Sequence, residues 1–219
     1  MCIRDRNNVL EFNRKFNWAI KFIFLLGIPS SIGLYFLSYE IINILFLRGE
    51  FSELDVINTS YSLKAFCFGL VAFMTIKILN VGFFAKQDPK TPMYVALLSL
   101  FLNVGLNWLL AFKFGYGHVG LAIGSVISAI VSFIVLMFFL LKRSILVLET
   151  QSFVFLFKII ISSLGLLTFL TAIHMFSSNW IELNLLIQFI SLSAIILVGS
   201  SIYFGLMFVQ GLRINFFRE

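Results

Sequence analysis

Lys77 and Asn80 interrupt a long apolar segment that ends at Lys86. Lys77 lies nine positions before Lys86, so in a helix, which rises 1.5 Å per residue, it is ~13 Å from that end. A lysine at this depth in a bilayer costs ~2.5 to 3.5 kcal/mol and needs water or a partner. Two interpretations are open: it attracts an anionic substrate group in a cavity, or it pairs with a carboxylate on another helix. We expect one inward-facing stripe of residues at helical spacing, namely Gly69, Phe73, Lys77, Asn80 and Phe84.

A second polar pattern lies in the next apolar segment, where Ser99, Asn103 and Asn107 recur at every fourth position. Such side chains need hydrogen-bond partners in lipid, and a neighbouring helix is the simplest source of them. Their oxygens could also bind a cation such as sodium, so Asn103 and Asn107 are candidate cation ligands.

The following segment carries small residues at the same spacing, Gly120, Gly124, Ser128 and Ser132, and predicts a face for close helix packing. The sequence shows no paired carboxylates, nucleophile arrangement, phosphate loop or cysteine and histidine cluster. His118 and His174 are isolated and are interpreted as structural. We therefore expect a protein that is not an enzyme and has no metal centre or cofactor, with a bound sodium ion as the one candidate.

These residues belong to a very apolar chain. Of its 219 residues 60% are hydrophobic and 12% are charged, and the mean hydropathy is +1.03. A soluble domain of this size could not bury so much apolar surface. The net charge of +6 is spread over the ends of apolar segments, which argues against a nucleic-acid partner.

Length and hydropathy predict an all-α, polytopic membrane bundle, because a span needs about 20 apolar residues. We expect six spans, over 18–46, 55–85, 91–112, 117–141, 153–176 and 185–209. Asp55 is the expected N-cap of the second span. Pro29 predicts a kink in the first span and a freed carbonyl that another helix must satisfy, and Gly33 predicts close approach of a neighbour.

The basic residues predict the orientation. If the N-terminus is cytoplasmic, only Arg48 and Lys113 lie at the outer ends of spans, whereas all the other basic residues outside the spans lie on the cytoplasmic side. Lys64 and Lys158 are expected to snorkel to an interface, and Glu40 and Glu182 to lie at the outer boundary. Both termini are therefore predicted to be cytoplasmic.

Five motifs occur in a characteristic order: GIPSSIGL before LFLRGEF, then TIKILNVGFFAKQDPKTP, then LNVGLNWLL, and then GHVGLAIGS. In order and spacing, residues 18–143 resemble the MurJ (MviN) family of lipid II flippases in the MOP exporter superfamily. The last two spans match in position more than in motif. The resemblance implies a MATE-like fold of fourteen helices, in which two lobes surround a cavity and two helices are added at the end.

On this basis the chain supplies six of the fourteen helices. The expected parts are a cytoplasmic segment over 1–17, of which 1–6 are interpreted as foreign sequence, four second-lobe spans over 18–143, and two additional spans with a cytoplasmic tail over 144–219. The family's cavity arginines and aspartate lie mostly in the earlier helices. Lys77 matches the family's lysine before the Gly-aromatic step and is assigned to the cavity wall, with Asn80 beside it.

The resemblance also bears on ions and lipids. Some members bind sodium through helices seven, eleven and twelve, and Asn103 and Asn107 fall at the helix-eleven positions, although the family's pattern has an acidic residue at the second. The last two helices resemble those that form a lipid-facing groove for the polyprenyl tail.

The implied function of the parent protein is to flip undecaprenyl-pyrophosphoryl-linked peptidoglycan precursor, lipid II, across the bacterial cytoplasmic membrane during cell wall biogenesis. The partners are then lipid II, membrane lipids and the missing helices, and the fragment alone should be inactive. Three alternatives stay open: a polysaccharide or O-antigen flippase or drug and cation antiporter of the same superfamily, a membrane-bound transferase, and a non-transporting partner in the cell-wall machinery.

Overall fold

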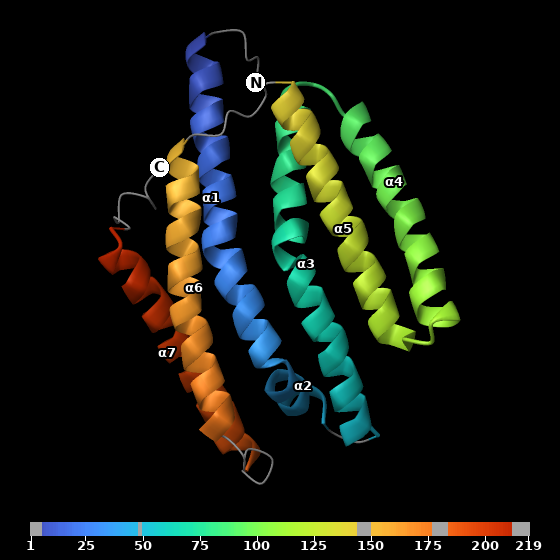
Figure 1. Ribbon diagram of the computed structural model, residues 1–219, viewed down its shortest axis with the longest axis vertical. Helices are drawn as coiled ribbons and strands as arrows, with labels where there is room; N and C mark the ends of the chain where they lie inside the picture. Colours follow the sequence, from blue (N-terminus) through green and yellow to red (C-terminus); the bar gives the residue numbers. More distant parts are fainter. Residues whose placement is uncertain (1–5, 48–49, 144–149, 177–183, 212–219) are drawn as a thin grey trace.

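The computed structural model describes residues 6–47, 50–143, 150–176 and 184–211 (Figure 1). Within these residues the chain is helical throughout. The elements in chain order are α1 (Arg6–Phe36), α2 (Ser38–Phe46), α3 (Glu53–Ala85), α4 (Lys90–Asn107), the π-helix η1 (Trp108–Lys113), α5 (Gly117–Lys142), α6 (Thr150–Phe176) and α7 (Leu185–Val209). Six helices in the described ranges are long and apolar enough to cross a membrane, which confirms the predicted fold class.

The helices pack in an order that differs from their order in the chain. α5 lies against both α3 and α4, α1 lies between α3 and α6, and α7 packs mainly on α6 (Figure 1). One buried cluster joins α1, α3, α4 and α5 through Phe16, Ile20, Leu79, Phe83, Val95, Leu136 and Leu140. α1, together with α2, therefore connects α3, α4 and α5 to the last two helices.

The first predicted span is too long. The structure ends α1 at Phe36, and a separate short helix, α2, follows a turn at Leu37. Ser38 is fully buried, and its hydroxyl donates at 3.0 Å to the Tyr35 carbonyl, which is one of the last four carbonyls of α1 and so lacks an amide partner within that helix.

The start of α3 also differs from the prediction, because Ser52 and not Asp55 is its N-cap. The Ser52 hydroxyl accepts from the Asp55 amide at 3.3 Å, and the Asp55 carboxylate accepts from the Ser52 amide at 3.0 Å. The two residues thus form a reciprocal capping box, which satisfies amides that an uncapped helix would leave unpaired.

The turn between α3 and α4 is held by one carboxylate. Gln87 takes a left-handed backbone conformation, with φ of 57°. The next residue, Asp88, accepts hydrogen bonds from the Thr91 hydroxyl at 2.6 Å and the Thr91 amide at 3.2 Å, and it pairs with Arg143 beyond the end of α5. These hydrogen bonds, with the Arg143 guanidinium, lower the pKa of Asp88 from 3.8 to about 2. The KQDPKTP motif therefore joins three helices at one end of the bundle.

Candidate functional site

Lys77 lies on an exposed face of α3. In the part of the chain that the structure describes, no carboxylate pairs with it. The predicted inward stripe is correct only in part. A Cβ on Gly69 would lie 2.9 Å from Val126 of α5, so this end of the stripe faces into the bundle. Phe84 is exposed like Lys77, so the other end faces away from the helices of this chain.

Asn80 is half-buried and lines a groove of about 470 Å³ between α3, α4 and α5. Its side-chain oxygen is buried and has no hydrogen-bond partner in the structure. Asn80 therefore presents an unpaired acceptor to the same groove that Ser99, Asn103 and Ser132 line.

The two candidate cation ligands are joined to each other and to α5. The Asn103 amide donates to the Ser125 hydroxyl at 3.0 Å, and the Asn107 amide donates to the Asn103 oxygen at 3.0 Å. Ser99 donates to the Ser128 carbonyl at 3.4 Å. Ser99 and Asn103 of α4 thus hydrogen-bond to the neighbouring helix α5, whereas the Asn107 side-chain oxygen is buried and has no hydrogen-bond partner in the structure. Sequence reasoning missed Ser125, which lies outside the four-residue pattern of α5.

All four small residues of α5 are buried, and they allow α4 and η1 to lie close. A Cβ on Gly120 would come within 2.8 Å of the Leu110 carbonyl carbon and 2.9 Å of the Ala111 nitrogen. A Cβ on Gly124 would collide with the side-chain oxygen of Asn107. The hydroxyls of Ser128 and Ser132 donate to carbonyls of their own helix at 2.9 and 2.8 Å. The backbone approach at Gly120 accompanies the π-helix, which the sequence did not predict.

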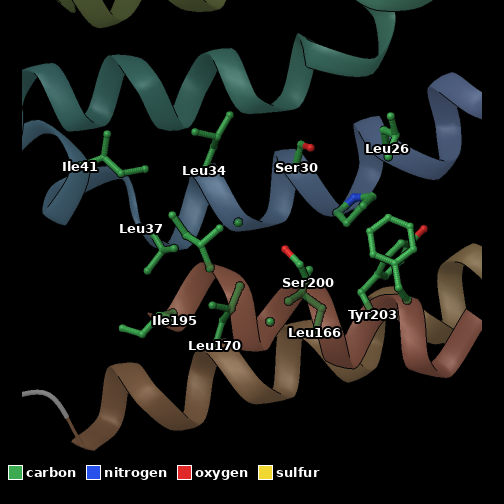
Figure 2. A pocket seen from close by; sticks show the side chains of 15 residues that line it. Leu26, Ser30, Leu34, Leu37, Ile41, Leu166, Leu170, Ile195, Ser200 and Tyr203 are labelled. Atoms are coloured by element: carbon green, nitrogen blue, oxygen red, sulfur yellow. The ribbon is translucent and has the colours of Figure 1, made fainter. Parts of the chain in front are cut away.

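An apolar groove of about 480 Å³ lies between α1, α2, α6 and α7 (Figure 2). Leu26, Leu34 and Leu37 line it from the α1 side, and Leu166 and Leu170 line it from α6. Gly33 also lines it, and a Cβ added there would have no atom within 4 Å. The prediction that Gly33 brings a neighbour close is therefore wrong, because this glycine leaves open space in the groove.

Tyr203 of α7 lies at one end of this groove and is fully buried. Its hydroxyl donates to the Leu25 carbonyl of α1 at 2.8 Å. That carbonyl is the one that Pro29 frees, because residue 29 would otherwise donate to residue 25. The expected partner from another helix is therefore present, and α1 continues as a single helix through Pro29. Tyr203 was not singled out from the sequence, where its signal is a lone tyrosine in an apolar span.

At the other end of the groove, α2 and α7 share polar contacts. The Asn43 amide donates to the Gln188 side-chain oxygen at 3.4 Å, and both residues are buried. Glu40, predicted to lie at an interface, is buried on α2 at 9% exposure because this helix turns back onto α3 and α7. Glu182 and the side chain of His174 lie outside the described residues.

The two lysines expected to snorkel each have a defined contact. Lys64 lies over the rings of Tyr35 and Tyr61, 5.8 and 5.5 Å from their centroids. Lys158 of α6 donates to the Gln210 carbonyl at 2.6 Å, just beyond the end of α7. A cation here interacts favourably with the carbonyl end of a helix.

The family model described as "Lipid II flippase MurJ" matches residues 2–207. A probable lipid II flippase MurJ of Haemophilus influenzae is 33% identical over 206 residues, which are 94% of this chain and 40% of that protein. A lipid II flippase MurJ of Burkholderia cenocepacia is 29% identical over 95% of this chain and 40% of its own length.

Among solved structures, a lipid II flippase MurJ in an inward closed conformation matches with a TM-score of 0.70 and 27% identity, over 90% of this chain and 40% of that one. The chain thus spans about 40% of the length of the relatives it matches. The six apolar spans, the KQDPKTP turn and this extent of similarity together show that the chain belongs to the MurJ family of lipid II flippases.

Proposed function

We propose that this chain is the C-terminal part of a flippase that moves lipid II from the cytoplasmic to the outer leaflet of the bacterial cytoplasmic membrane. The observation that carries the proposal is the groove beside α6 and α7, which is lined mostly by leucine, isoleucine, glycine and aromatic residues, with Ser30 and Ser200 as its two serines. A polyprenyl tail is an apolar chain that must remain in a lipid-like environment while its pyrophosphate and sugars cross. The groove matches the tail in chemistry.

The head group needs a different environment, and Lys77 supplies part of it. Its exposed position on α3 suits a wall that faces water, because a lysine in contact with lipid tails would be costly. In the complete protein the missing helices would close a cavity over this face, and rocking of the two lobes would expose it to each side in turn. The fragment alone lacks that enclosure and should not transport.

This proposal assigns transport and not catalysis to the chain, and it places both termini in the cytoplasm by the bias of the basic residues. A polysaccharide exporter or a cation antiporter of the same superfamily is the alternative. The membership in the MurJ family favours lipid II as the substrate.

The cluster of Asn103, Asn107 and Ser125 supports a further part of the proposal, a sodium site that is completed by another helix. Asn107 offers one unpaired buried oxygen. Sodium, like other hard cations, prefers several oxygen ligands, so the ligands that this cluster lacks must come from helices outside this chain.

The test is complementation in cells depleted of their own lipid II flippase. The full-length protein, with its upstream helices restored, is compared with Lys77→Ala and with Lys86→Ala, an exposed lysine at the end of the same helix. We expect growth with the intact protein and with Lys86→Ala, and lysis with Lys77→Ala. Growth of all three would remove Lys77 from the mechanism. No rescue by well-inserted full-length protein would favour the polysaccharide exporter.

A further inference from the structure

Pro29 leaves a specific gap in the hydrogen bonding of α1. A proline has no amide hydrogen, so the carbonyl four residues earlier, on Leu25, loses its helical donor. Leu25 is fully buried, and its surroundings in a bilayer offer no water to replace the lost bond. An unpaired carbonyl at this depth is unfavourable, and the structure fills the gap with one group, the hydroxyl of Tyr203 at 2.8 Å.

This hydrogen bond joins two helices that otherwise have few contacts. α7 packs mainly on α6, and α1 is reached from α7 at the buried cluster of Leu25, Ile159, Tyr203 and Met207. Pro29 and Tyr203 both line the groove, and Figure 2 shows Tyr203 at the end of the groove nearest Leu26. The Tyr203 hydroxyl thus makes a direct hydrogen bond between α1 and α7, beside the packing of both helices on α6.

We propose that Tyr203 is a positioning residue of the groove: its hydroxyl takes the place of the amide that Pro29 lacks, and so holds α7 against α1. The aromatic ring alone would fill the same space but would not fix the orientation of α7 relative to α1. The hydrogen bond fixes the ring relative to one carbonyl, and the proline ensures that no backbone amide competes for that carbonyl. Pro29 and Tyr203 thus act as one unit.

The consequence for transport rests on the proposed function, because it assumes that the groove receives the polyprenyl tail. The structural claim itself does not. It requires only that the Tyr203 hydroxyl stabilises the fold when residue 29 is proline. This stabilisation should be lost when residue 29 can donate its own amide to the Leu25 carbonyl.

A double-mutant cycle tests this coupling in the full-length protein. The variants are Tyr203→Phe, Pro29→Ala and the two combined, and the measurement is the thermal unfolding midpoint in detergent. We expect Tyr203→Phe alone to lower the midpoint by roughly 2 °C or more, because the carbonyl is left unpaired. In the Pro29→Ala background the same substitution should lower it by less than half as much, because the restored amide bonds Leu25. Tyr94→Phe, at an exposed position of α4, is the control, and its effect should not depend on residue 29.

A distance measurement separates positioning from stability alone. Spin labels are attached at Arg14→Cys on α1 and Ser201→Cys on α7, both exposed and outside the groove lining, in a background in which the native cysteines are replaced. We expect Tyr203→Phe to broaden the distance distribution or shift it to longer values. An equal cost of Tyr203→Phe in both backgrounds would overturn the pairing, and an unchanged distance distribution would overturn the positioning role. Both measurements are independent of whether the protein flips lipid II.

Discussion

Gly120→Ala tests whether the small-residue face of α5 sets the distance to η1. The added methyl carbon would lie 2.8 Å from the Leu110 carbonyl carbon, 2.9 Å from the Ala111 nitrogen and 3.0 Å from the Ala111 Cα. Ordinary carbon contacts are about 3.5 to 4.0 Å, so the helices must separate by about 1 Å. All three atoms belong to the backbone, and no side-chain rotation can relieve the overlap.

The size of the effect follows from two opposing contributions. Overpacking of this kind costs about 1–3 kcal/mol, and the rigid backbone partner favours the upper part of that range. Alanine is a better helix former than glycine by about 1 kcal/mol, which offsets part of the loss. We expect Gly120→Ala to lower the free energy of unfolding by about 1–2 kcal/mol.

Gly105→Ala is the matched control. Gly105 is helical like Gly120, but it is exposed, and a Cβ added there would have no atom within 4 Å. The substitution should be neutral or slightly stabilising. Gly124→Ala should fall between the two, since the Asn107 side chain can rotate away at the cost of its bond to Asn103, and the nearest backbone atom, the Asn107 nitrogen, lies at 3.3 Å. Unfolding of the full-length protein by SDS titration in mixed micelles measures all three. Equal stability of Gly120→Ala and Gly105→Ala would refute the close approach.

Two further predictions concern charge and ions. The pKa of Asp88 is about 2, below its ordinary 3.8, so the ionised carboxylate contributes fully to stability above about pH 5 and loses this contribution as the pH falls through 2. Asp88→Asn should therefore lower the unfolding midpoint equally at pH 5 and pH 8. A decrease that differs between these two pH values would contradict the lowered pKa. If the Asn103 cluster contributes to a sodium site, the full-length protein should have a higher thermal unfolding midpoint in a sodium buffer than in a potassium buffer, whereas Asn103→Ala should have the same midpoint in both. An equal response of the two proteins would exclude Asn103 as a ligand.

The spans could be predicted from sequence because the bilayer imposes their length on each segment separately. The prediction of 185–209 agrees with α7, and 117–141 differs from α5 by one residue. The break at Leu37 was missed because 18–46 is apolar as a whole, although Ser38, Tyr39 and Glu40 follow Leu37 directly. The sequence predicted that another helix would satisfy the carbonyl freed by Pro29. It could not identify Tyr203 as the donor, since this residue lies 178 positions from Leu25.

The polar residues inside the spans divide by what they can satisfy within their own helix. A serine or threonine hydroxyl reaches a carbonyl one turn back, as Thr75 does to Val71 at 2.6 Å and Ser193 does to Phe189 at 2.8 Å. Such residues need nothing from outside and do not mark a site. An asparagine has two donors and an acceptor, and one turn of helix cannot satisfy them all.

Asn80 and Lys77 differ from these hydroxyl residues, because the hydrogen-bonding and charged groups of neither are fully paired within the described helices. Asn80 has an unpaired buried oxygen, and Lys77 has an exposed ammonium without a carboxylate partner there. Both lie on α3, three residues apart, at a depth where lipid would penalise each of them. The face of α3 that carries them must then meet water, a substrate or helices beyond this chain, and this requirement is the physical reason to look for the substrate cavity on that side of α3.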